Sequence, residues 1–174
     1  SYNPEENKNV VVSMGAADPV NATFDIVESL SHNDYIRSFL RVIVGFLNPH
    51  KEQIEWICKK NNIQVLSSLP LISEELVQAK FVIGASGVSA WERCYLGIPS
   101  LMIAIADNQV PIAKILHDQD AAIFLGVHTD MKWGIFSKTV ESIYYNSNRL
   151  IEISKNAQSI VDGLGATRIS CYIL

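Results

Sequence analysis

The chain has 174 residues, of which 48% are hydrophobic and 18% charged, and its formal net charge is −4 at pH 7. This length is enough for one domain with its own core, and the composition excludes a disordered chain. The slightly acidic balance argues against nucleic acid or an anionic membrane surface as a partner, because both are bound through basic patches.

In chain order, a polar segment comes first and six short apolar runs follow it. The segment NPEENKN predicts a linker over residues 1–8 that follows an N-terminal region, and one domain over residues 9–174. The runs are rich in Val, Ile and Leu and largely apolar, which is typical of parallel strands covered on both faces. They predict strands at 10–14, 40–44, 63–66, 81–83, 101–105 and 122–125.

Helical patterns alternate with these runs. Pro111 falls in the first turn of one predicted helix and Gly97 just after the end of another, which are favoured positions for these residues. The alternation predicts an α/β fold, a Rossmann-like doubly wound parallel sheet of about six strands. The predicted helices are 21–30, 51–61, 73–79, 88–96, 110–119, 132–145 and 148–160.

The commonest strand order of such a sheet is 3-2-1-4-5-6, in which strands 1 and 4 are neighbours. Ligands bind these folds in the crevice between the carboxyl ends of those two strands. Two loops rich in Gly and Ala are expected to meet there, GAADPVN (15–21) and GASGVS (84–89). The predicted topology therefore places a ligand site between them.

The GASGVS loop has the composition of an anion-binding turn. Gly84 and Gly87 allow a ligand to approach the backbone closely, and Ser86 adds a hydroxyl. The N–H groups of Gly87, Val88 and Ser89 would be unpaired donors at a helix N-terminus, which suits a phosphate. A tight strand-to-helix turn capped by Ser86 explains the same residues, so the loop alone leaves both interpretations open.

Glu92 lies about one turn into the helix that follows this loop. A carboxylate at that position can accept hydrogen bonds from both ribose hydroxyls, as acidic residues do in dinucleotide-binding folds. A surface charge paired with a nearby cation is the alternative. In the other loop, Gly15 allows a close ligand approach, and Asp18 before Pro19 is typical of a helix cap.

Three polar residues, Asp107, Asn108 and Gln109, end the fifth predicted strand. Their side chains carry hydrogen-bonding groups suited to a sugar, and a helix cap would account for only one of them. No G-x-G-x-x-G follows the first strand and no P-loop is present, which disfavours a hydride-transfer enzyme and a nucleotide triphosphatase.

The remaining motifs supply little chemistry. The four histidines have no metal-ligand spacing and form no Ser/His/Asp arrangement, so we expect neither a metal nor a general base. We place His117 on a helix surface and His128 in a loop.

Cys58, Cys94 and Cys171 lack a CxxC pairing, which predicts reduced thiols in a cytoplasmic protein. No stretch is long and apolar enough for a membrane span.

Several motifs together resemble a known family. GASGVSAWE, LGIPS and ADNQ, in this order, are similar to the carboxyl-terminal half of GT-B enzymes of the MurG-like group. SMGAADPVNAT and DGLGATR (162–168) narrow the resemblance to the UDP-sugar hydrolase of pseudaminic acid biosynthesis and its relatives in spore-coat polysaccharide synthesis. The resemblance spans about residues 10–168 and implies a UDP-sugar partner with no metal or other cofactor.

The resemblance also implies a role for each matching residue. The UDP phosphates would be held by Ser86, Gly87, Val88, Ser89, Gly15 and Ala16. Glu92 would bind the ribose, Ser68 and Leu69 the uracil, and Asn108, Gln109 and Asp18 the sugar. Ala16 and Ala17 stand where relatives often carry Gly-Ser, which weakens the case for a side-chain role of that loop.

Three functions remain open from the sequence. The chain is the nucleotide-binding half of a UDP-sugar hydrolase, the same half of a glycosyltransferase, or a non-catalytic nucleotide-sugar-binding domain fused to another enzyme of glycan synthesis. In that hydrolase family the presumed general base is a histidine of the N-terminal domain, for which this chain has no matching residue. We therefore expect the chain alone to be inactive and to need that domain as a partner.

Overall fold

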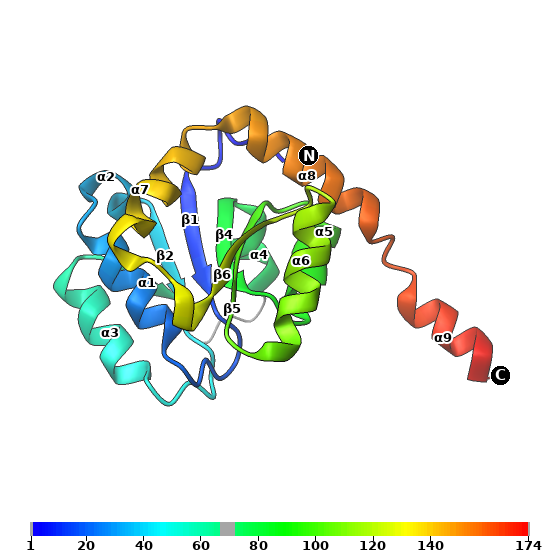
Figure 1. Cartoon of the computed structure of the whole chain (residues 1–174), viewed down its shortest axis with the longest axis horizontal. Coiled ribbons are helices and arrows are strands. Elements are labelled where there is room, and N and C mark those ends of the chain that lie inside the picture. The colour runs from blue at the N-terminus through cyan, green and yellow to red at the C-terminus, as the bar shows by residue number, and fades with distance from the viewer. Residues whose placement is uncertain (1, 67–71, 174) are drawn as a thin grey trace.

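A six-stranded parallel sheet forms the centre of the molecule (Figure 1). The computed structural model describes residues 2–66 and 72–173. Its strand order is β3-β2-β1-β4-β5-β6, which confirms the predicted order and the α/β fold class. Each predicted strand lies within two residues of an observed one. The strands are β1 (Asn9–Ser13), β2 (Leu40–Ile43), β3 (Gln64–Leu66), β4 (Ala79–Ala85), β5 (Ser100–Ala104) and β6 (Ile123–Val127).

Helices cover both faces of the sheet. In the described part of the chain they are α1 (Ala22–Ser31), α2 (Asp34–Ser38), α3 (Lys51–Lys60), α4 (Ile72–Val77), α5 (Ser89–Leu96), α6 (Val110–Asp118), α7 (Trp133–Tyr144), α8 (Ser147–Ile160) and α9 (Gly165–Ile173). Short 3-10 turns, η1 (Asp107–Gln109) and η2 (His128–Asp130), follow β5 and β6. The sequence patterns predicted seven of the α-helices and missed α2 and α9.

Alternate residues of each strand point to opposite faces and belong to separate cores. Val10 and Val12 of β1 pack with α1, α3 and α7, whereas Val11 packs on the other face with Leu76 of α4. Met102 of β5 belongs to the core beneath α5, α6 and α8. The central strands β1, β4 and β5 are buried on both faces, which explains their largely apolar sequences, whereas Gln64 of the edge strand β3 is exposed. Helix α9 extends away from this body (Figure 1).

Residues 2–8, predicted as a linker, are held against the sheet. The Tyr2 hydroxyl donates a hydrogen bond to the Lys80 carbonyl at the start of β4. Lys80 is 6% exposed, and its ammonium donates to the Pro4 carbonyl at 2.6 Å and lies 4.8 Å from the centre of the Tyr144 ring. These contacts fix the segment at the amino ends of the strands.

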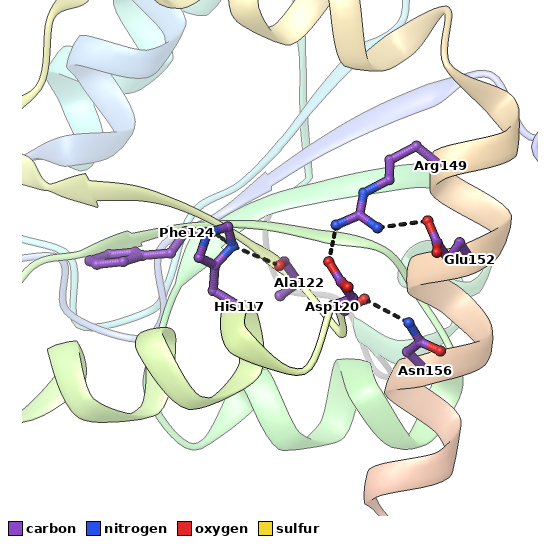
Figure 2. A network of polar contacts seen from close by, with 7 residues as sticks. All are labelled: His117, Asp120, Ala122, Phe124, Arg149, Glu152 and Asn156. Carbon is purple, nitrogen blue, oxygen red and sulfur yellow. Dashed lines mark hydrogen bonds and ion pairs between the residues drawn. The ribbon is translucent and has the colours of Figure 1, made fainter.

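Helix α8 is tied to the turn between α6 and β6 (Figure 2). Arg149 forms ion pairs with Asp120 and, at 2.7 Å, with Glu152, and the Asn156 amide donates to the Asp120 carbonyl at 3.3 Å. On its inner side the Ser154 hydroxyl donates to the carbonyl of Gly97, the residue that ends α5, at 2.6 Å. Helix α8 therefore holds the carboxyl-terminal end of α5 in place.

Candidate functional site

The loops that follow β1, β2 and β4 meet at the carboxyl edge of the sheet. A Cβ atom on Gly84 would lie 2.9 Å from the Ser13 carbonyl oxygen, so the ends of β4 and β1 are in close contact. The backbone N–H of Leu47 donates to the Ala16 carbonyl at 3.1 Å, which joins the loop after β2 to the loop after β1. This edge is the switch point of the strand order, where α/β folds bind ligands.

A cavity of about 970 Å³ lies at this edge, on the face covered by α4 and α5. Four of the residues singled out from the sequence line it: Gly15, Ala16, Ser89 and Glu92. Apolar side chains form much of the opposite wall, among them Leu66, Ile72 and Leu76. The volume is at the upper end of the range usual for small-molecule sites. Lys51 and Arg93 also line it, and the sequence had assigned neither to the site.

The turn between β4 and α5 presents unpaired donors. The Ser86 side chain is fully buried, and its hydroxyl has no hydrogen-bond partner among the described residues. The N–H groups of Gly87 and Val88 form no hydrogen bond with the described residues either. Helix α5 begins at Ser89, one residue later than predicted, and Val88 before it supplies no side-chain cap. The turn therefore keeps the donors that an anion would accept.

Arg93 lies directly beneath this turn. It is 1% exposed and donates to the Ser100 hydroxyl at 2.9 Å, the Ser89 hydroxyl at 3.0 Å and the Ala85 carbonyl at 2.7 Å. No carboxylate among the described residues pairs with it. Burial lowers the pKa of Arg93 to about 10, while Cys94 and Glu92 act in the opposite direction. At neutral pH the site therefore contains a buried positive charge.

Gly84 makes room for this arginine. A Cβ at position 84 would lie 3.1 Å from Nη1 and 3.2 Å from Cζ of Arg93, closer than most carbon contacts in proteins. One feature of the sequence did point to a role for Arg93 in the site. This residue lies four positions after Ser89 in the predicted helix, so the two side chains are expected on the same side of that helix. Only the structure shows that its guanidinium points inward.

Glu92 is exposed on α5, three residues after Ser89, and both line the cavity. Residues three apart in a helix lie on one side of it, so the carboxylate and the Ser89 hydroxyl are neighbours on the cavity wall. No cation among the described residues pairs with Glu92. The alternative interpretation, in which Glu92 is a surface charge paired with a nearby cation, therefore has no such cation among the described residues.

Gln109 approaches the turn from the loop after β5. Its Oε1 accepts a hydrogen bond from the Ile105 N–H at 3.1 Å, and its Nε2 would lie 3.8 Å from a Cβ on Gly87. Asn108 is exposed in η1 beside it. Neither residue lines the cavity, and of the turn between β4 and α5 the same holds for Ser86, Gly87 and Val88. The predicted sugar-binding segment therefore lies next to that turn and outside the enclosed volume.

Asp18 is the helix cap rather than an open carboxylate. It is 2% exposed, and its two oxygens accept the N–H groups of Ala22 and Thr23, each at 2.9 Å. The capping interpretation thus accounts for this side chain, and its burial leaves little of the carboxylate open to a sugar. The Asn21 side chain, directly before α1, makes no capping hydrogen bond. Ser68 and Leu69, the predicted uracil contacts, lie outside the described residues.

The histidines stand apart from the cavity. His128 Nε2 lies 2.8 Å from an Asp25 carboxylate oxygen, a pair that the sequence did not predict. His117 Nδ1 lies 3.4 Å from the Ala122 carbonyl oxygen, which the ring contacts from α6. Among the described residues no group of three or more potential ligands could hold a metal ion, and no helix is long and apolar enough to cross a bilayer.

Sheet order, helices and cavity define the Rossmann-like fold of GT-B, MurG-like enzymes. MurG of Acinetobacter baumannii superposes with a TM-score of 0.80 at 16% identity, over 97% of this chain and 50% of MurG. The UDP complex of S. aureus MnaA gives a TM-score of 0.71 at 12% identity, over 98% of this chain and 46% of MnaA. These likenesses establish the fold.

In sequence, the chain is similar to the spore coat polysaccharide biosynthesis protein SpsG of Bacillus subtilis. The two are 24% identical over 175 residues, which is 95% of this chain and 50% of SpsG. No family model matches the chain. The chain thus spans about half the length of the relatives it matches.

Proposed function

We propose that this chain is the nucleotide-sugar-binding half of an enzyme of surface-polysaccharide biosynthesis, and that its ligand is a UDP-sugar. The observation that carries the proposal is the combination at one cavity of Ser89 at the start of α5, the buried Arg93 and the unpaired carboxylate of Glu92, next to a turn whose Gly87 and Val88 N–H groups are unpaired. Cation and N–H donors suit a diphosphate, and the carboxylate suits the ribose hydroxyls next to it.

Within that class, the proposed reaction is hydrolysis of a UDP-linked acetamido-trideoxy sugar with release of UDP, as the sequence resemblance implies. Transfer of the sugar to an acceptor hydroxyl is the alternative, and it suits the fold equally well, because glycosyltransferases such as MurG share it. Both reactions need the same donor-binding half. They differ in the nucleophile that attacks the anomeric carbon, water or an acceptor hydroxyl, which the partner domain would bind and activate.

Isothermal titration calorimetry of the 174-residue chain with UDP, CMP and NAD tests the nucleotide assignment. We expect UDP to bind most tightly and no UDP-sugar to be turned over. Equal affinity for UDP and CMP would contradict the assignment of uracil as the base. With the N-terminal domain present, release of UDP without any acceptor would support hydrolysis, and release only in the presence of an acceptor would support transfer.

A further inference from the structure

The turn between β4 and α5 has an unusual balance of hydrogen-bonding groups. An arginine side chain only donates hydrogen bonds, whereas a serine hydroxyl donates one and accepts up to two. Since Arg93 Nη1 lies 3.0 Å from Ser89 Oγ, the serine oxygen must be the acceptor of that bond. The hydroxyl proton of Ser89 is not used in that bond and can be donated only to another acceptor.

The described residues offer no such acceptor to either serine of the turn. Ser89 Oγ donates to none of them, and Ser86 Oγ, fully buried, has no partner of any kind. Leaving a buried hydroxyl unpaired costs stability, so native structures retain one mainly where a role requires it. The Ser89 hydroxyl on the cavity wall therefore has a proton to donate beside the unpaired N–H groups of Gly87 and Val88, and the buried Ser86 hydroxyl behind it keeps unused hydrogen-bonding capacity.

The charge beneath the turn points to the same kind of ligand. The other two bonds of Arg93, to the Ala85 carbonyl and the Ser100 hydroxyl, tie it to neutral groups. Glu92 influences this charge but forms no ion pair with it, and a buried charge without a direct partner is costly unless something compensates it. A ligand group that accepts hydrogen bonds and carries negative charge would satisfy the two hydroxyls and the cation together.

We propose that Arg93 is a positioning residue that turns Ser89 into an obligatory donor and, with Ser86, makes this turn selective for a diphosphate. The proposal rests on the nucleotide-binding function proposed above. A diphosphate has only acceptor oxygens in its ionised form, whereas a sugar or ribose hydroxyl would bring a proton of its own. Arg93 thus acts on the ligand through Ser89 and through its charge.

A purely architectural role is the competing explanation, because the three bonds of Arg93 also join α5 to β4 and β5. Such a role would weaken the binding of every part of the nucleotide equally. Selective support of the diphosphate would weaken UDP and leave uridine, which lacks phosphates, unaffected. The ratio of the dissociation constants of uridine and UDP separates the two explanations.

The experiment measures that ratio by calorimetry for the wild-type chain, Arg93→Met, Arg93→Lys, Ser89→Ala and Ser89→Ala/Arg93→Met, with Arg37→Met on α2 as the matched control. We expect the ratio to fall by about 10- to 100-fold in Arg93→Met, the size of a lost charged hydrogen bond. Lysine keeps the charge but lacks the planar fork with which Arg93 reaches its three partners, so Arg93→Lys should restore part of the ratio. Arg37→Met should leave it unchanged.

The double variant tests whether Arg93 acts through Ser89. In the Ser89→Ala background, Arg93→Met should lower the ratio by less than in the wild-type background, because the shared bond is already absent. Thermal unfolding of each variant checks that it is folded. Should Arg93→Met not fold, Ser89→Ala and Arg93→Lys still decide the matter, since each must lower the ratio.

Each adverse outcome has its own meaning. An unchanged ratio in folded Arg93 and Ser89 variants, with wild-type chain that prefers UDP to uridine, overturns the positioning role and leaves the proposed function standing. A wild-type chain that binds UDP no better than uridine overturns the diphosphate site itself, and with it the proposed function.

Discussion

Gly45 and Ala16 are in direct backbone contact, since a Cβ atom on Gly45 would lie 2.3 Å from the Ala16 carbonyl oxygen. Gly15 is almost as close, with its carbonyl oxygen 2.4 Å from the same position. The loop after β2 thus sets the position of the loop after β1, and both line the cavity. A residue remote in sequence from the proposed phosphate turn therefore shapes the opposite wall of the site.

Replacing Gly45 by Ala should displace the Gly15–Ala16 backbone. We expect a loss of roughly 1–3 kcal/mol in the free energy of unfolding, the usual cost of forcing a methyl group into a packed site, together with weaker UDP binding. Denaturant unfolding and calorimetry measure the two effects. Gly134→Ala is the control, because a Cβ there meets nothing within 4 Å. Equal behaviour of the two variants would contradict the contact.

Asp18 should matter for stability more than for ligand affinity. Its carboxylate accepts two N–H groups at the start of α1, and loss of such a cap costs about 0.5–2 kcal/mol. Asp18→Ala should therefore unfold at a lower denaturant concentration. Asp18→Asn, which keeps one acceptor oxygen, should lie between the alanine variant and the wild type.

A direct contact between Asp18 and the sugar would give a different pattern. Affinity for a UDP-sugar would then fall in Asp18→Ala while affinity for UDP stayed constant. We expect the two affinities to change in parallel, since both respond only to the altered loop.

Glu92→Ala should weaken UDP binding by about 1–3 kcal/mol if the carboxylate holds the ribose hydroxyls. The specific readout is discrimination between UDP and 2′-deoxy-UDP, which the wild type should show and the variant should lose. Glu28→Ala removes an exposed carboxylate from α1 and serves as the control. Unchanged discrimination in Glu92→Ala would return this residue to the role of a surface charge.

The buried thiol of Cys58 predicts a pH dependence of stability. Burial, and secondarily the Glu55 carboxylate, raises the pKa of Cys58 from 9.0 to about 12. Above pH 9 the unfolded chain releases this proton while the folded chain retains it. The free energy of unfolding should therefore decrease as pH rises above 9, by at most about 1.4 kcal/mol per pH unit for one proton.

The Cys58→Ala variant isolates this contribution. Between pH 9 and 10.5 its stability should fall less steeply than that of the wild type, as measured by urea unfolding at each pH. Cys171→Ala is the matched control, because it removes an exposed thiol from α9. Identical slopes for the wild type and Cys58→Ala would show that this thiol does not contribute.

The sheet could be predicted because its strands are recognisable in the sequence. Each one is a short run rich in Val, Ile and Leu, and the observed order β3-β2-β1-β4-β5-β6 follows from the commonest way of winding such a chain. Helix α2 was missed because five residues are too few to show a helical period, although the Asn33 side chain does cap it.

The site was predictable only in part, because side-chain direction is a tertiary property. The glycine-rich turn and the carboxylate one helical turn further on are visible as a pattern. Arg93 looked like any surface charge on a helix until Ser100 and Gly84 were seen to enclose it. Asp18 shows the converse, since either a cap or a ligand contact explained it until its two N–H partners were located.

The unpaired hydroxyl of Ser86 has a consequence for anyone who redesigns this domain. Replacing an unpartnered buried polar group by an apolar one is neutral or stabilising, so Ser86→Ala should melt at the same temperature or higher when no nucleotide is present. Selection for thermostability alone would therefore tend to remove the very groups that we assign to the ligand. Consensus or computational stabilisation of this fold should hold Ser86, Ser89 and Arg93 fixed.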